Sequence, residues 1–173
     1  MVTRARLNPT SRSSLRLPLM ISVFVLATAC SQAPRKSMSE TDSGIDSLNA
    51  RLVQAYRNRD PRIYATLFTD SAVFEWPAFQ TVRGRAGLEA MARSNWRSLN
   101  DQDLQLIVSF RRVALDHATE FGAFQQSWRD STGVRMTEFG RYVVLLDRHG
   151  DSSWLIDRFF GFEDSTRSSS TRP

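Results

Sequence analysis

The sequence predicts an α+β domain in which a curved antiparallel sheet wraps around three N-terminal helices and leaves a cavity between them. Two observations carry this prediction. Amphipathic patterns with helical spacing dominate residues 43–99, and long alternating patterns separated by tight turns dominate the rest of the chain. Helices followed by a run of strands is the order of an α+β fold. The 173 residues suffice for one domain with a substantial core.

Three helices are expected. The first begins near Ser43 or Ile45, and its buried face is formed by Ile45, Leu48, Leu52, Ala55 and Tyr56. Asp60-Pro61 then caps and starts a short second helix. A turn at 69–71, a strand over 72–76 and a loop lead to a third helix, which starts at Gly84 and extends to Leu99.

Four strands are expected after the helices. Their ranges are 104–110, 118–128, 134–148 and 154–163. Short turns rich in Asp, His and Gly separate them, so neighbouring strands should pair as an antiparallel meander.

The first 29 residues have the pattern of a signal peptide. Arginines precede an apolar run of about 13 residues, which is too short for a membrane span. The run ends in Ala27-Thr28-Ala29-Cys30, which resembles the lipobox of bacterial lipoproteins, and Cys30 is the only cysteine. We therefore expect a lipid anchor on Cys30. The alternative is an ordinary signal peptide with an incidental cysteine.

This leader determines the expected location and the charge. A lipidated Cys30 would hold the protein at a bacterial cell envelope without spanning the membrane. Because Ser31 follows the cysteine, the outer membrane facing the periplasm is expected if the organism is Gram-negative; without lipidation the protein would be secreted. After the leader the chain has 19 basic and 18 acidic residues, so removing the leader lowers the net charge from +5 to about +1. No nucleic-acid partner is expected for a nearly neutral domain.

The composition divides the remaining chain into three parts. Residues 30–42 are polar and are predicted to form a tether. Residues 43–164 are predicted to form the folded domain, and residues 165–173 a disordered tail.

Four stretches in this order resemble the nuclear transport factor 2-like superfamily, and within it the SnoaL-like and ketosteroid-isomerase-like domains. They are RNRDPRIYATLFTDSAVF (57–74), VRGRAGLEAM (82–91), ATEFGAF (118–124) with FGRYVVLL (139–146), and WLIDRFFGF (154–162). The resemblance implies a cone-shaped, cystatin-like half-barrel of bent strands with a pocket at its open end. It also implies a homodimer formed through the outer face of the sheet.

Such relatives include isomerases, dehydratases and cyclases as well as binding domains, so the fold leaves the function open. An enzyme of this kind would need a carboxylate base and hydrogen-bond donors in the pocket. The candidate bases are Glu138, Asp157 and Glu120, each on a strand rich in apolar residues. The alternative is that these carboxylates face water or pair with arginines. Strand alternation places Glu138 on the same face as Tyr142, whereas it leaves open which of Asp157 and Arg158 faces the pocket.

Aromatic side chains are the candidate ligand-binding residues, because a flat apolar molecule would pack against them. The predicted set is Tyr56, Tyr64, Phe74, Trp76, Trp96, Trp128, Tyr142 and Phe159. The alternative is that they form the core. No metal and no cofactor is expected: His117 and His149 lie in turns without a third ligand nearby, and no glycine-rich phosphate loop follows a strand.

The sequence favours an envelope-anchored domain that binds a small apolar molecule or a partner without catalysis. The alternative is an isomerase, dehydratase or cyclase that uses a pocket carboxylate as general base. A dimeric scaffold with a filled interior is the third hypothesis.

Overall fold

The computed structural model describes residues 38–77, 79–150 and 153–169, with side chains described from residue 43 onward. Two helices come first, α1 (Met38–Arg57) and α2 (Pro61–Thr66), followed by strands β1 (Phe68–Glu75) and β2 (Val82–Arg83). Helix α3 (Gly84–Asn95) and a 3₁₀ turn, η1 (Trp96–Ser98), lead into the long strands. These are β3 (Asn100–Val113), β4 (His117–Arg129), β5 (Arg135–His149) and β6 (Ser153–Ser169). The leader and Cys30 lie outside the described residues.

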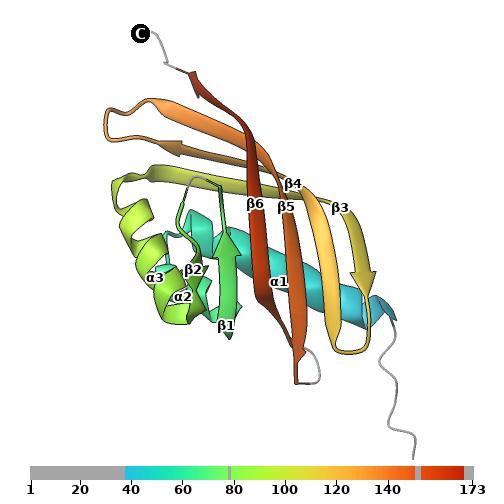
Figure 1. Cartoon of the computed structure of the whole chain (residues 1–173). Coiled ribbons are helices and arrows are strands. Elements are labelled where there is room, and N and C mark those ends of the chain that lie inside the picture. Colours follow the sequence, from blue (N-terminus) through green and yellow to red (C-terminus); the bar gives the residue numbers. More distant parts are fainter. Residues whose placement is uncertain (1–37, 78, 151–152, 170–173) are drawn as a thin grey trace, which may run out of the picture. The chain divides into compact units, whose positions relative to one another are not determined.

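The six strands form one curved sheet in the order β2-β1-β6-β5-β4-β3. The predicted meander is confirmed, because β3 to β6 pair with their neighbours in antiparallel register. Figure 1 shows α1 running across the concave side of these strands, where it packs against β3 and β6. Helix α3 packs against α2 and β1. The α+β fold class is therefore as predicted.

One part of the predicted sheet is wrong: the sheet is mixed and not wholly antiparallel. Strand β1 pairs with β6 in parallel, with Phe74 opposite Phe159. The two strands are separated by the whole meander, so no tight turn dictates their relative direction.

Helix boundaries differ modestly from the prediction. Helix α1 begins at Met38, so part of the predicted tether at 30–42 is helical. The predicted start of α2 is confirmed, because Asp60 accepts a hydrogen bond from the backbone N–H of Ile63 at 2.9 Å and Pro61 occupies the first helical position. Helix α3 ends at Asn95 and continues as the 3₁₀ turn rather than reaching Leu99 as α-helix.

Two strand boundaries also need correction. Residues 69–71, predicted as a turn, lie inside β1, where the register against β6 shifts between Phe68 and Val73. Residues 165–169, predicted as disordered tail, form the end of β6 and pair with the start of β5, with Ser168 opposite Met136. Backbone hydrogen bonds to β5 order this polar segment, and its exposed side chains explain the polar composition.

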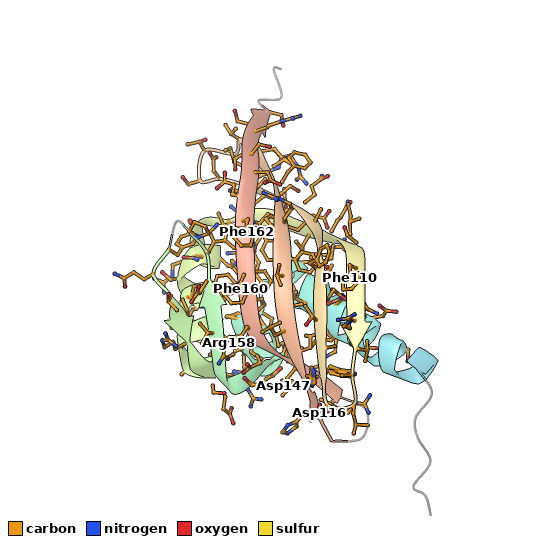
Figure 2. The ribbon with its side chains drawn as sticks, turned by 45° about the vertical axis from the view of Figure 1, so that its right-hand side comes forward. Phe110, Asp116, Asp147, Arg158, Phe160 and Phe162 are labelled. Carbon is orange, nitrogen blue, oxygen red and sulfur yellow. The ribbon has the colours of Figure 1, made fainter. Side chains whose placement is uncertain are left out.

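The two faces of the sheet differ in what covers them. The concave face and the helices enclose a core that includes Ile45, Phe68, Leu88 and Ile156. The convex face carries apolar side chains that remain exposed, and Figure 2 shows Phe110, Phe160 and Phe162 on this side. None of the described helices combines the length and apolarity that crossing a bilayer requires.

Candidate functional site

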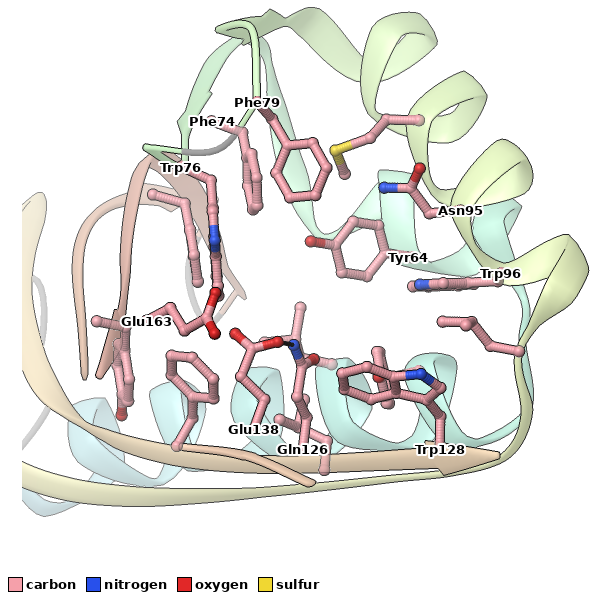
Figure 3. A pocket seen from close by; sticks show the side chains of 18 of the residues that line it. Tyr64, Phe74, Trp76, Phe79, Asn95, Trp96, Gln126, Trp128, Glu138 and Glu163 are labelled. Carbon is pink, nitrogen blue, oxygen red and sulfur yellow. Dashed lines mark hydrogen bonds between the residues drawn. The ribbon is translucent and has the colours of Figure 1, made fainter. Parts of the chain in front are cut away.

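A cavity of about 490 Å³ lies between the concave face of the sheet and the helices. This size is suitable for a small organic molecule. Strands β3 to β6 supply one wall, and β1, α1, α2 and α3 supply the others. Figure 3 shows aromatic side chains surrounding the space, with a few polar groups among them. The cavity contradicts the third hypothesis, a scaffold with a filled interior.

All eight aromatic residues predicted to bind a ligand line this cavity, and two further phenylalanines join them. The complete aromatic lining is Tyr56, Tyr64, Phe74, Trp76, Phe79, Trp96, Phe124, Trp128, Tyr142 and Phe159. Many also pack on one another: the rings of Phe74 and Phe159 stack 4.8 Å apart, and Tyr64 meets Trp96 edge-on at 5.2 Å. The core and lining interpretations therefore both apply, because these rings present one side to the cavity and the other to the core.

Glycines on the concave face make room for two of these rings. A Cβ added at Gly161 would overlap the indole of Trp76, and one added at Gly140 would overlap the ring of Phe124. The missing side chains let the aromatic rings lie directly on the backbone of the sheet. The width of the cavity thus depends on glycine positions in β5 and β6.

Glu138 is the predicted base that lies at the cavity. Its residue is only 8% exposed, and its Oε2 accepts a hydrogen bond from Gln126 Nε2 at 2.9 Å. Its Oε1 has no hydrogen-bond partner among the described residues. Burial raises the pKa of this carboxyl, the hydrogen bond from Gln126 partly opposes that rise, and the charge of Glu163 adds to it.

Glu163 is a cavity residue that sequence reasoning missed. It lies opposite Gly140 in the β5–β6 register and is exposed at the cavity. Figure 3 shows its carboxylate close to that of Glu138. The signal was present in strand alternation, because Glu163 shares a face with Gly161 and Phe159, but the strand was expected to end there.

Glu120 is buried, yet it does not line the cavity. Its Oε1 accepts hydrogen bonds from Asn49 Nδ2 and from the Tyr142 hydroxyl, both at 2.9 Å. Its Oε2 accepts a hydrogen bond from Arg111 Nε at 2.7 Å, and Arg111 also pairs with Asp46. With both oxygens engaged, Glu120 is a structural anchor between β3, β4, β5 and α1, and the geometry does not support it as a base.

Asp157 also lies away from the cavity. It sits where the β5–β6 register shifts between Leu145 and Leu146, accepts a hydrogen bond from Thr69 Oγ1 at 2.9 Å and pairs with Arg158 at 2.7 Å. Arg158 lies opposite Leu145, a residue of the convex face. Neither residue of the pair therefore faces the pocket, because a bulge breaks the strict alternation on which that expectation rested.

The three tyrosines of the predicted ligand-binding set all reach the cavity, with different partners. The Tyr142 hydroxyl donates a hydrogen bond to Glu120, and burial, followed by the neighbouring charge of Glu120, raises the pKa of Tyr142. Burial raises the pKa of Tyr56 to about 12, and the charge of Glu138 contributes to the shift. Burial likewise raises the pKa of Tyr64, whose hydroxyl points toward the cavity in Figure 3. All three phenols stay protonated near neutral pH, and because the one O–H of Tyr142 is used by Glu120, Tyr56 and Tyr64 are the candidate donors to a ligand.

The histidines take no part in this site. His117 is exposed and hydrogen-bonded to Asp116 at 2.7 Å at the hairpin between β3 and β4. Within the ranges that the structure describes, no group of three or more His, Cys, Asp or Glu side chains is placed to hold a metal ion.

The fold and the cavity define a class of protein, an α+β domain whose bent sheet and helices enclose a ligand-sized pocket. A family model described as the SnoaL-like domain matches residues 37–159. The chain therefore belongs to the SnoaL-like domain family, and the resemblance to the nuclear transport factor 2-like superfamily is confirmed. No curated protein sequence matches the chain.

Solved structures share this fold at low sequence identity. A ketosteroid isomerase-like protein from Erwinia carotovora atroseptica is 19% identical, with 71% of this chain and 95% of that chain covered and a TM-score of 0.61. The hexachlorocyclohexane dehydrochlorinase LinA-type3 from Novosphingobium barchaimii is 15% identical, with 79% and 97% covered and a TM-score of 0.66. A nuclear transport factor 2-like protein from Salmonella enterica is 15% identical, with 75% and 94% covered and a TM-score of 0.67. At these identities the likeness establishes the fold alone.

Proposed function

We propose that the cavity binds a small, largely apolar molecule and that Glu138 accepts a proton from it. The observation that carries this proposal is the buried Oε1 of Glu138, which has no partner among the described residues although it lies at an aromatic cavity. A buried acceptor without a partner costs free energy, and such groups concentrate at functional sites. We therefore propose that the cavity carries out an isomerase-, dehydratase- or cyclase-type reaction.

The surroundings of Glu138 suit a general base. Burial raises its pKa, which makes the carboxylate a stronger proton acceptor than an exposed glutamate. In the proposed step, a C–H beside a carbonyl gives its proton to Oε1, and the electron pair moves into the carbonyl to form an enolate. The hydroxyl of Tyr64 or Tyr56 would donate a hydrogen bond to the enolate oxygen. The relatives described as isomerase-like and as a dehydrochlorinase support a reaction that removes a proton from carbon.

The simpler alternative is ligand carriage without catalysis, which the sequence favoured. The same aromatic walls support it, whereas the free oxygen of Glu138 supports catalysis. Proton exchange distinguishes the two, because a carrier has no reason to accelerate it.

The test is deuterium exchange of 2-tetralone and related aromatic ketones in D₂O, followed by NMR with the purified protein. We expect wild-type protein to accelerate exchange beside the carbonyl, and Glu138→Gln to lower the rate about 100-fold or more. Glu75→Gln is the matched control, because Glu75 is exposed on β1 outside the cavity. Equal exchange rates for wild type and Glu138→Gln would overturn the assignment of the base. Ketone binding without accelerated exchange would support carriage.

We also propose that Cys30 is lipidated and anchors the domain at the cell envelope. The motif Ala27-Thr28-Ala29-Cys30 after an apolar run supports this proposal. Metabolic labelling with an alkyne fatty acid should mark the wild-type chain and leave Cys30→Ser unmarked. Labelling of both chains would contradict it, as would a wild-type chain that is secreted without label.

A further inference from the structure

The cavity has an unbalanced charge. Glu138 and Glu163 both line it, and none of its described lining residues is Lys, Arg or His. Glu138 is more than nine-tenths buried with an unpartnered Oε1, and its carboxylate points into the cavity in Figure 3. A buried carboxylate usually has a positive or hydrogen-bonding partner for each oxygen, because an uncompensated charge is costly away from water.

The arginines of the neighbouring strands do not supply that partner. Arg141 on β5 lies opposite Phe162 on the convex face and forms a two-pronged pair with Asp164, at 2.8 Å and 3.1 Å. Arg167 on β6 lies over the ring of Phe139, 5.4 Å from its centre. Arg111 is committed to Glu120 and Asp46. The positive charges near the site are thus engaged elsewhere.

The aromatic walls are a second, independent feature that favours a positive charge. Trp76, Trp128, Tyr64 and Phe159 all line the space that contains the two carboxylates. The faces of aromatic rings carry partial negative charge and attract cations, tryptophan most strongly. This attraction is strongest for an ammonium group that has left water. An anionic group placed beside the two carboxylates would instead be repelled by them.

We infer that the ligand of this cavity is an organic cation, a flat apolar body that carries an amine or quaternary ammonium group. The cationic group pairs with Glu163 at the exposed side, and the apolar body packs between the aromatic walls beside Glu138. Glu163 is then the residue that selects for charge. This inference rests on the proposed function, because it names the substrate class of the same cavity.

The test uses isothermal titration calorimetry to compare three probes that share a 2-naphthylmethyl group and differ in charge: 2-naphthylmethyl-trimethylammonium, 2-naphthylmethanol and 2-naphthylacetate. We expect the purified wild-type protein to bind the cation about tenfold more tightly than the alcohol and the anion most weakly. In Glu163→Gln the preference for the cation over the alcohol should fall to about threefold or less. Glu75→Gln should keep the wild-type preference, since it removes the same charge outside the cavity.

Each outcome has a distinct meaning. If the alcohol binds as tightly as the cation, the inference is wrong while the proposed binding function stands. If none of the probes binds, the cavity is not a site for such molecules and the proposed function fails as well. If the cation is preferred equally by wild type and Glu163→Gln, the assignment of Glu163 is overturned.

Discussion

Two buried glutamates show how local partners decide the role of a residue. Both oxygens of Glu120 accept hydrogen bonds, from Asn49, Tyr142 and Arg111. Glu138 has one oxygen bonded to Gln126 and one without a partner among the described residues. The first arrangement provides partners for both oxygens of a buried carboxylate, and the second leaves an acceptor available for a ligand.

Arg111→Leu should destabilise the protein strongly, because it leaves Glu120 as an uncompensated buried charge. The expected loss is about 3–5 kcal/mol in the free energy of unfolding. Arg141→Leu is the matched control, since its pair with Asp164 is exposed to solvent and its loss should lower the free energy of unfolding far less. Urea unfolding measures both values. Similar losses for the two variants would show that the Glu120 network does not carry this stability.

Glu138→Gln should change the pH dependence of stability. The folded pKa of Glu138 is raised by burial, so ionisation is harder in the folded than in the unfolded chain. Its favourable contribution is therefore complete below the unfolded pKa and is lost as the pH rises through the folded pKa. The melting temperature of Glu138→Gln minus that of wild type should therefore be larger at about pH 7 than at about pH 3.

Thermal melts across this range provide the measurement, with Glu75→Gln as a control for an exposed carboxylate on β1. Melting temperatures of wild type and Glu138→Gln that change in parallel with pH would contradict the prediction.

At the scale of the elements, glycines in three strands determine where neighbouring side chains and backbone can pack closely against the sheet. Gly161 and Gly140 leave space for Trp76 and Phe124, as described above. A Cβ added at Gly122 on β4 would overlap the carbonyl oxygen of Ile107 and lie 3.0 Å from the Tyr142 hydroxyl. All three glycines lie on the concave face, and their missing side chains leave more space between the sheet and the helices.

Gly161→Ala should destabilise the protein and disturb the cavity by displacing the Trp76 ring. We expect a loss of about 1–3 kcal/mol, the usual cost of overpacking. The same change made in a Trp76→Leu background should cost less, because the smaller side chain leaves room for the new methyl group. A double-mutant cycle from urea unfolding measures this coupling. Additive effects of the two changes would contradict the contact as the cause.

At the scale of the whole molecule, the convex face of the sheet is apolar and exposed. Ile107, Phe110, Phe121, Leu145 and Phe162 are all more than a third exposed there. The rings of Phe110 and Phe121 stack 5.1 Å apart on neighbouring strands. Exposed apolar patches of this kind usually mark an interaction surface.

We propose that a second copy of the chain covers this face, as the resemblance to dimeric relatives implies. Light scattering during size-exclusion chromatography should give a dimer for wild type and a monomer for Phe121→Arg, because burying an unpaired guanidinium is costly. Leu115→Arg serves as the control, since Leu115 is exposed in the turn after β3. A monomeric wild type, or a Phe121→Arg dimer, would overturn the proposal.

Much of this protein follows from the sequence alone, because its local signals are strong. Helical and alternating spacings indicated the order of the elements, and Asp60-Pro61 indicated the start of α2. Alternation along β5 correctly placed Glu138 on the same face of the strand as Tyr142, and both line the cavity. The eight predicted aromatic residues all line the cavity.

Only the tertiary structure decided which carboxylates are available for chemistry. The three candidate carboxylates look alike in sequence, but each has a hydrogen-bond partner on another element. Glu120 is bonded to Asn49, Glu138 to Gln126 and Asp157 to Thr69. The parallel pairing of β1 with β6 and the extension of β6 past Glu163 likewise depend on contacts between distant segments. Local spacing encodes which face a side chain occupies, whereas the partner it meets there is determined by long-range packing.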